Sequence, residues 1–225
     1  MAKRPRLLVI GFGPFPRVPR NPSATAARRV AASPRWRILG IVADALVLPT
    51  TYAALDTVLD PALDARRFSA LLMIGVAGRA KKIRVERRAV NRASILFPDA
   101  AGRTPARLTM AQAPASRTVR MAPAPVLATL RRRGLACADS QDAGRYLCNA
   151  AYMRALAAPV PVLFIHIPKP PRAMRPIASR RQRRVSWQDR LTAGLADVAL
   201  DLLRRRRFTL GVSRELFLGE RLAVR

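Results

Sequence analysis

The sequence has few of the residues that usually carry metal or disulfide chemistry. Its 225 residues include one histidine, two cysteines and only 13 acidic side chains. Two cysteines are too few for a disulfide framework, which favours a reduced, cytoplasmic setting. A zinc site needs about four ligands, and two cysteines with one histidine do not supply them. We therefore predict no metal site.

Long apolar runs are also missing. No stretch approaches the ~18 residues needed to cross a bilayer, so we expect no membrane partner. The N-terminus does resemble a secretory signal, with basic residues in 3–6, an apolar stretch at 7–15 and Ala-Thr-Ala at 24–26. Two glycines and a proline interrupt that apolar stretch, however, and cleavage would remove a first strand. We expect a cytoplasmic protein, with export as the alternative.

Acidic residues are so scarce that the charge is extreme. The chain has 42 Lys and Arg residues, a net charge of +29 and a pI near 12.0. Such a field attracts polyanions, and nucleic acid is the usual one. The arginines are nevertheless scattered among alanines and prolines, only 5% of residues are aromatic, and no nucleic-acid-binding motif is present. Nucleic-acid binding is therefore not favoured, although it stays open as an alternative.

Apolar segments of strand length alternate with helical segments along the chain. The predicted strands are 6–11, one or two within 36–48, 69–75, 83–90, 135–138 and 160–168. The predicted helices begin near 22, 51, 126, 145 and 187, and the last ends near 207. This alternation predicts an α/β fold, a three-layer α/β/α sandwich around a mostly parallel twisted sheet. Residues 1–207 would form one domain, with a C-terminal extension of uncertain structure at 208–225.

A cysteine and the sole histidine occupy positions that suit chemistry. Cys148 falls in the first turn of the helix predicted at 145–156, where the helix dipole and free N–H groups lower a thiol's pKa. His166 ends the apolar strand 160–168, at the sheet edge where open α/β folds place their sites. These are the parts of a Cys–His nucleophile pair. The alternative is that both are buried structural residues.

Glu86 is the only acidic residue between Asp64 and Asp99. It lies among several lysines and arginines, so it either neutralises their charge or orients an imidazole. The second cysteine, Cys137, falls in a short predicted strand and is interpreted as structural. A Cys137–Cys148 disulfide remains open at this point.

The loop after the first strand, Gly11-Phe-Gly-Pro-Phe15, is rich in aromatic and turn residues. Asn21 then caps a helix that has proline at its first position. The loop is not a dinucleotide fingerprint, because the third glycine is missing. Phe12 and Phe15 are either core residues or the walls of a small flat pocket.

Four segments in this order resemble the pyroglutamyl peptidase I (pyrrolidone-carboxylate peptidase) family of cysteine peptidases. They are Gly11-Phe-Gly-Pro-Phe15 with Asn21-Pro22, Glu86-Arg-Arg-Ala-Val-Asn91, Ala143-Gly-Arg-Tyr-Leu-Cys-Asn149 and Phe164-Ile-His-Ile-Pro168. The resemblance covers residues 7 to about 200. It implies an α/β/α sandwich, often a homotetramer, that removes N-terminal pyroglutamate from peptides without a metal or cofactor.

The resemblance also implies roles for individual residues. Cys148 would be the nucleophile, His166 the general base and acid, and Glu86 the group that orients the imidazole. Phe12, Phe15 and Tyr146 would form the walls of the pocket that holds the substrate lactam. Asn21 would support the loop beside this pocket, and Val76 would lie next to the lactam. A flat, uncharged ring suits aromatic walls.

Four positions depart from the family's pattern. Val76 replaces a glutamine beside the lactam site, Arg79 a glycine, Leu96 an arginine near the oxyanion, and Ala150 the histidine after Cys-Asn. Loss of an oxyanion-side donor typically costs ~10²–10³ in rate. Two alternatives to the peptidase therefore stand: a family member with lost or altered hydrolase activity, and a basic polyanion-binding protein on the same fold.

Overall fold

The computed structural model describes residues 4–15, 18–65, 67–105, 107–109, 113–170 and 185–219, with side chains of the last helix described as far as Arg205. Residues 168–185 are rich in proline and arginine, a composition that predicts a loop, and most of them lie outside these ranges, as do residues 220–225. Within them, no helix is long and apolar enough to span a membrane.

A six-stranded sheet forms the centre of the molecule, in the order β2-β1-β3-β8-β4-β7. Neighbouring strands are parallel, except that β4 runs antiparallel to β8. The antiparallel pair β5–β6 forms a separate small sheet. The strand bounds are β1 Arg6–Phe12, β2 Val42–Leu48, β3 Ala70–Val76, β4 Ile83–Glu86, β5 Arg88–Val90, β6 Ser116–Thr118, β7 Cys137–Ser140 and β8 Val162–Ile167.

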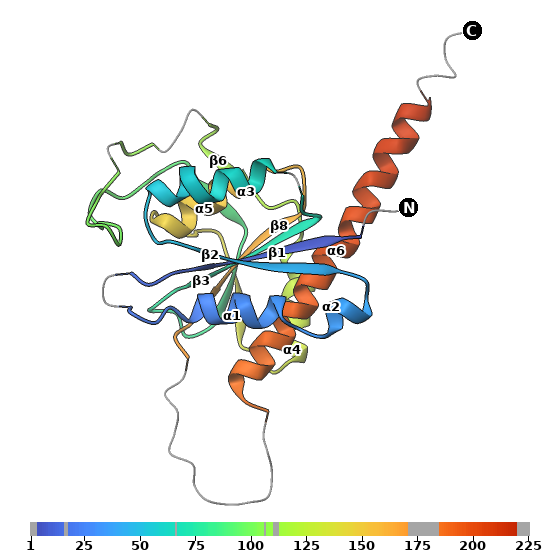
Figure 1. Cartoon of the computed structure of the whole chain (residues 1–225), viewed down its shortest axis with the longest axis horizontal. Helices are drawn as coiled ribbons and strands as arrows, with labels where there is room; N and C mark the ends of the chain where they lie inside the picture. The colour runs from blue at the N-terminus through green and yellow to red at the C-terminus, as the bar shows by residue number, and fades with distance from the viewer. Residues whose placement is uncertain are drawn as a thin grey trace, which may run out of the picture.

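Helices cover both faces of the sheet (Figure 1), which confirms the predicted three-layer α/β/α sandwich. One face carries α1 (Pro22–Ala31), α2 (Arg35–Ile38), α4 (Pro123–Arg132) and α6 (Trp187–Gly219). The other carries the π-helical turn η1 (Leu55–Leu59), α3 (Asp60–Asp64) and α5 (Leu147–Ala155).

Successive side chains along each strand point to opposite faces of the sheet and pack into two separate hydrophobic cores. In β1, Leu7 and Val9 pack into the core under α1, α4 and α6, whereas Leu8 and Ile10 pack into the core under η1 and α5. A strand that is apolar on both faces fits only a sheet covered on both sides, which explains its continuous apolar sequence. Side-chain parity therefore decides which layer each strand residue contacts.

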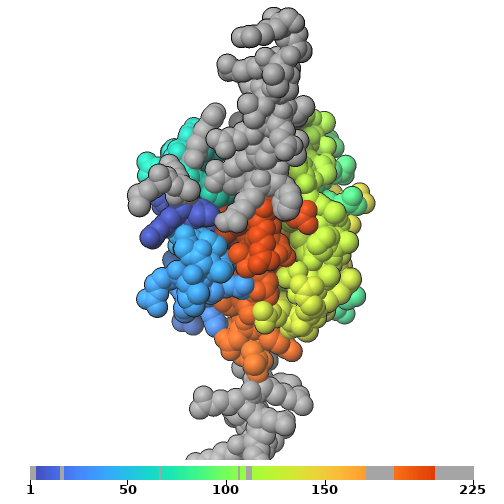
Figure 2. Space-filling model, turned by 90° about the vertical axis from the view of Figure 1, so that its right-hand side faces the viewer, coloured from blue at the N-terminus to red at the C-terminus, as the bar shows by residue number. Residues whose placement is uncertain are grey.

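The last helix, α6, lies between α1 and α4 (Figure 2). Its first turn is fixed by a capping box of the Ser-x-x-Asp form, in which the Asp189 N–H donates to Ser186 Oγ at 3.1 Å. Asp197 binds Arg35 at 2.6 Å and Arg133 at 2.7 Å, so one carboxylate ties α6 to α2 and to the end of α4. The helix continues to Gly219, beyond the predicted end near 207.

Three local predictions differ from the structure. Trp36 was expected in a strand, but it lies in α2, where its indole donates to Val30 O at 2.6 Å in the core. The strand predicted at 83–90 divides at Arg87, because β4 pairs with β8 and β7 while β5 turns away to pair with β6. The strand predicted at 135–138 begins two residues later, as β7.

Candidate active site

His166 lies near the C-terminal end of β8 and is 7% exposed. Its register partners are Gly75 on β3 and Arg84 on β4. Val162 and Phe164, at the same parity, belong to the core under α5, so His166 also faces the α5 layer. The sheet thus presents the imidazole to the helix that carries Cys148.

Cys148 is the second residue of α5, in its first turn as predicted, and it is half-buried. Its sulfur lies close against Gly75: a Cβ added there would be 3.0 Å from Sγ and 2.8 Å from the Phe164 ring. Gly75 is the register partner of His166. The missing side chain at position 75 therefore leaves the space in which the sulfur sits, one strand away from the imidazole and on the same face.

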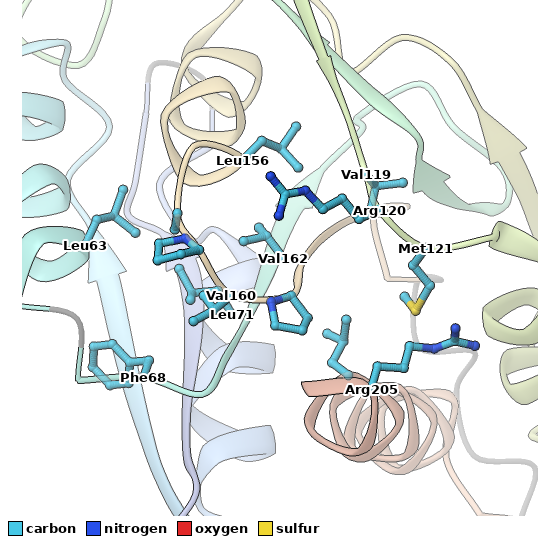
Figure 3. Close-up of a pocket in the computed structure, with 14 residues that line it drawn as sticks. Leu63, Phe68, Leu71, Val119, Arg120, Met121, Leu156, Val160, Val162 and Arg205 are labelled. Carbon is cyan, nitrogen blue, oxygen red and sulfur yellow. The ribbon is translucent and has the colours of Figure 1, made fainter. Parts of the chain in front are cut away.

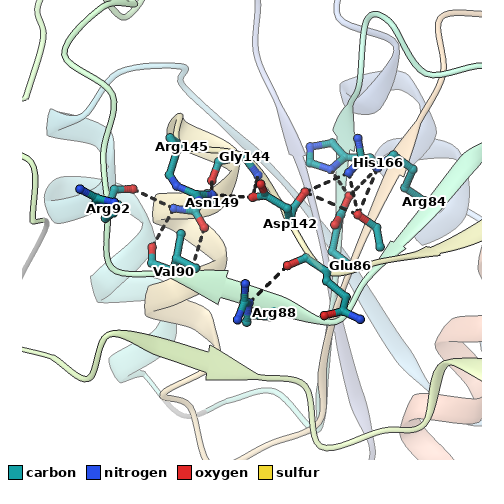
Figure 4. A network of polar contacts seen from close by, with 12 residues as sticks. Arg84, Glu86, Arg88, Val90, Arg92, Asp142, Gly144, Arg145, Asn149 and His166 are labelled. Carbon is teal, nitrogen blue, oxygen red and sulfur yellow. Dashed lines mark hydrogen bonds and ion pairs between the residues drawn. The ribbon is translucent and has the colours of Figure 1, made fainter.

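Glu86 is completely buried, and its Oε1 lies 2.8 Å from His166 Nδ1 (Figure 4). An ionised carboxylate can only accept, so with Glu86 ionised Nδ1 donates in this pair and Nε2 is the nitrogen left to act as a base. The Tyr152 hydroxyl donates to the Glu86 carbonyl at 2.9 Å, which ties α5 to β4. The structure therefore brings Cys148, His166 and Glu86 to one edge of one sheet face.

The pKa of the Cys148 thiol differs from the sequence-based prediction. Burial, followed by the negative charge of Glu86, raises the pKa of Cys148 to about 12, although its own backbone N–H favours the thiolate. The predicted lowering by the helix start is therefore outweighed. The resting group is a neutral thiol, and a thiolate must be produced by proton transfer during the reaction.

The two cysteines are free, so the disulfide alternative is not formed. Cys137 packs in the core under α4 and α6, whereas Cys148 packs on the α5 face. The sheet lies between them. Among the described residues, no group of three or more His, Cys, Asp and Glu side chains could hold a metal ion.

The aromatic residues expected at the site occupy different depths. Phe12 is 1% exposed and packs on Phe164, with ring centroids 6.0 Å apart, and Phe164 packs on His166 at 4.7 Å. Phe15 is half-buried in the following loop. Tyr146 caps the start of α5, contacts Tyr52 edge-on and donates to Pro98 O at 2.9 Å. Phe12 thus supports the site from below.

Two other predicted residues have clear positions. Asn21 caps α1 by accepting from the Ser23 N–H, and its amide donates to Gly13 O at 2.9 Å, so it holds the loop after β1. Val76, in contrast, packs on the core under α1 and α6. Its side chain therefore points to the sheet face opposite Cys148, because it follows Gly75 by one residue.

Several site residues were missed by the sequence analysis. Asn149 makes three hydrogen bonds to the chain around β5, accepting from Val90 N and donating to Val90 O and Arg92 O. Arg84 lies 3.4 Å from Glu86 and also bonds the turn before α5. Period-two spacing on β4 was the available signal for Arg84, since residues 84 and 86 share a face.

One apolar cavity is distant from this chemistry. It measures about 260 Å³ and lies between apolar side chains that include Leu71 and Val162, near the starts of β3 and β8 (Figure 3). His166 lies at the other end of the same strands. The cavity is therefore separate from the candidate site.

A sheet covered on both faces, with a thiol, an imidazole and a carboxylate at one edge, defines an α/β protein of the thiol-hydrolase class. The comparisons agree. A family-wide sequence model described as pyroglutamyl peptidase matches residues 5–186. A pyrrolidone-carboxylate peptidase of Chromobacterium violaceum is 36% identical over 164 residues, covering 72% of this chain and 77% of the relative.

Two further relatives extend the match. A pyrrolidone-carboxylate peptidase of Gloeobacter violaceus is 31% identical, covering 88% of this chain and 97% of its own. The crystal structure of the pyrrolidone carboxyl peptidase from Fervidobacterium islandicum superposes with a TM-score of 0.73 at 25% identity, covering 90% of this chain and 99% of that one. The chain belongs to the pyroglutamyl peptidase family, a family of cysteine peptidases, and the predicted family is confirmed.

Proposed function

We propose that this protein removes N-terminal pyroglutamate from peptides, with Cys148 as the nucleophile, His166 as general base and acid, and Glu86 as the residue that orients the imidazole. The observation that carries the proposal is the 2.8 Å contact between His166 Nδ1 and Glu86, on the sheet face that also holds the Cys148 sulfur. Family membership supplies the substrate class.

The geometry supports a two-step reaction. His166 Nε2 takes the thiol proton as Sγ attacks the carbonyl that links pyroglutamate to the next residue. The C–N bond then breaks, His166 returns the proton to the departing amine, and a thioester remains on Cys148. Water, deprotonated by His166, hydrolyses the thioester and releases free pyroglutamate and the thiol.

The start of α5 is suited to the negative charge that forms on the carbonyl oxygen. N–H groups in the first turn of a helix have no intrahelical acceptor, so they can donate to an oxyanion beside Cys148. We assign the substrate lactam to the aromatic side of the site, near Tyr146 and Phe15, with Phe12 and Asn21 supporting the loop. Val76 joins this set only through the strand backbone, because its side chain faces away. A charged peptide amine would be stranded in apolar surroundings, which favours the closed lactam.

A family member with reduced or altered activity is the second candidate. Leu96, where the family has an arginine, is 78% exposed and places no cation near the oxyanion. Ala150 is buried and supplies no imidazole. These two residues remove supporting groups and leave the Cys148, His166 and Glu86 set complete.

We also propose a cytoplasmic homo-oligomer, a dimer or a tetramer. Three consecutive apolar side chains, Ile95, Leu96 and Phe97, are more than half exposed, and so is Leu108, whose carbonyl accepts from the Ala93 N–H. Clustered apolar exposure of this kind favours contact with a second copy. The molar mass in solution, measured by light scattering, tests this.

The proposed activity is tested with a fluorogenic pyroglutamyl amide. Wild-type protein should release the fluorophore, and Cys148→Ala should lower kcat by roughly four orders of magnitude because the nucleophile is removed. An amide of glutamine, with its free amine, serves as the matched substrate control and should be inert. If folded wild-type protein does not turn over the pyroglutamyl amide, the peptidase proposal is wrong and altered activity is favoured.

A further inference from the structure

We infer that Arg84 is a positioning residue for the proposed reaction: its guanidinium stabilises the ionised Glu86–His166 pair and ties that pair to the turn that leads into the nucleophile helix. This inference rests on the proposed function for its kinetic consequences. It rests on geometry alone for its effect on the imidazole.

The first step concerns the environment of Glu86. The carboxylate is completely buried, and Oε1 receives both the 2.8 Å contact from His166 and the 3.4 Å contact from Arg84 Nε. Oε2 has no hydrogen-bond partner among the described residues. A buried carboxylate with so few donors is costly to ionise unless a cation lies beside it. In the part of the chain that the structure describes, Arg84 is the arginine in contact with it.

The second step concerns how Arg84 is placed. It precedes Glu86 by two residues on β4, so the two side chains share the face that looks toward α5. Arg84 is also the direct register partner of His166 across the antiparallel β4–β8 pair. Residues opposite each other in an antiparallel pair are close neighbours. The strand pairing therefore places Arg84 opposite His166 on β8, and its guanidinium contacts Glu86 directly.

The third step is the connection to α5. Arg84 Nη2 donates to Ser140 Oγ at 2.7 Å and to Asp142 O at 3.0 Å. Asp142 in turn accepts from the Gly144 N–H and binds Arg145, two residues just before the helix that carries Cys148 (Figure 4). One side chain thus joins the Glu86–His166 pair to the turn that positions the nucleophile.

Among the described residues, the other groups that face the Glu86–His166 pair do not supply a second positive charge. From α5 come the Cys148 thiol and the Tyr152 hydroxyl, which are neutral at pH 7 because burial raises the pKa of each. The turn before α5 contributes Asp142, whose carboxylate is engaged by Gly144 and Arg145. Removal of the Arg84 charge should therefore make the imidazole–carboxylate pair easier to protonate.

The test uses the fact that His166 is the only histidine in the chain. Protein labelled with ¹⁵N-histidine gives a single imidazole, whose titration is followed by NMR without assignment. In Arg84→Met the titration midpoint should move up by about half a pH unit or more, because a cation is lost. In Arg84→Lys, which keeps the charge, it should stay near the wild-type value.

The matched control is Arg88→Met. Arg88 donates to Gln141 O at 3.3 Å in the same turn, so the variant loses an equal charge and a similar bond without touching Glu86. Its midpoint should equal that of wild type. An Arg84→Met midpoint that also equals wild type overturns the inference, whatever the enzyme's activity. If Arg84→Met does not fold, the Arg84→Lys variant decides. A His166 titration midpoint in Arg84→Lys that differs from the wild-type midpoint by about half a pH unit would also overturn the inference.

Kinetics provide the second measurement. In Arg84→Met the acidic limb of kcat/KM should shift to higher pH, with a fall of about tenfold or more near neutrality. Arg84→Lys should keep the wild-type limb but lose several-fold in kcat, because a lysine cannot hold both Ser140 and Asp142. Equal losses in both variants without a shift of the limb would indicate a merely structural role and contradict the inference. A wild type that turns over no pyroglutamyl amide defeats the proposed function, while the NMR result still decides the inference.

Discussion

At the scale of single residues, the Cys148 thiol and the His166 imidazole have complementary states. Burial and the nearby Glu86 charge hold the thiol neutral, and the same carboxylate fixes the imidazole with Nε2 free to accept a proton. The nucleophile is therefore formed on demand, when the imidazole takes the thiol proton. A resting thiolate–imidazolium pair is not what this environment favours.

Alkylation of Cys148 measures that resting state. Because the pKa of the thiol is raised to about 12, the thiolate fraction should grow about tenfold per pH unit between pH 7 and 10, and iodoacetamide should react at a rate that follows it without a plateau. Cys148→Ala reports the background from Cys137, which is buried. Fast alkylation that is independent of pH near neutrality would contradict the account.

At the scale of elements, the site depends on the close approach of α5 to β3. Gly75 is the contact point, since any side chain there would meet the Phe164 ring and the Cys148 sulfur at 3.0 Å or less. The turn at Gly78, three residues on, is open by comparison. A Cβ there would meet Lys169 at an ordinary 3.5 Å.

Gly75→Ala should therefore displace the sulfur and lower kcat/KM by about 10²-fold, with a loss of about 1–3 kcal/mol in the free energy of unfolding from overpacking. Gly78→Ala is the matched control and should change either quantity little. Both are measured by turnover of the pyroglutamyl amide and by urea unfolding. Wild-type kinetics in Gly75→Ala would show that the sulfur does not react from this position.

Most elements could be predicted from the sequence because their signals are local. Strand β8 and the start of α5 follow from an apolar run and from turn residues, and they place His166 and Cys148 correctly within their elements. The contact between Glu86 and His166 could not be predicted from spacing, because it requires β4 to enter the sheet antiparallel beside β8. The resemblance to the family predicted that Val76 lies beside the lactam. Because side chains alternate along β3, its side chain instead points to the sheet face opposite Cys148.

The pKa of Cys148 shows a related limit. The position of the residue in the first turn of α5 was predictable, and so was the favourable effect of the helix start. The opposing effects, burial under the sheet edge and the charge of Glu86, depend on tertiary packing. A local sequence signal can therefore give the sign of one contribution without giving the net shift.

At the scale of the whole molecule, the charge of +29 is the least explained feature. In the described part, arginines lie on every layer, and several bind carboxylates on other elements, such as Arg154 with Asp56 and Asp60 and Arg6 with Asp44. A distributed charge of this kind attracts any polyanion weakly.

RNA or DNA binding should accordingly be visible only at low salt. The affinity of a duplex oligonucleotide, followed by fluorescence anisotropy, should fall steeply as salt rises and be undetectable at physiological ionic strength, because counterion release supplies all of it. Heparin should displace the oligonucleotide as well as a second nucleic acid does. Persistent, sequence-dependent binding at physiological salt would favour the polyanion-binding alternative instead.

The central claim is that the Cys148 sulfur attacks the pyroglutamyl carbonyl. The most direct measurement quenches the enzyme with acid during turnover of a pyroglutamyl substrate and maps the modified peptide by mass spectrometry. The account predicts a pyroglutamyl thioester on Cys148, present in wild type and absent from His166→Ala, in which no base activates the thiol. Turnover accompanied by acylation at Cys137, or turnover that persists in Cys148→Ala, would contradict it.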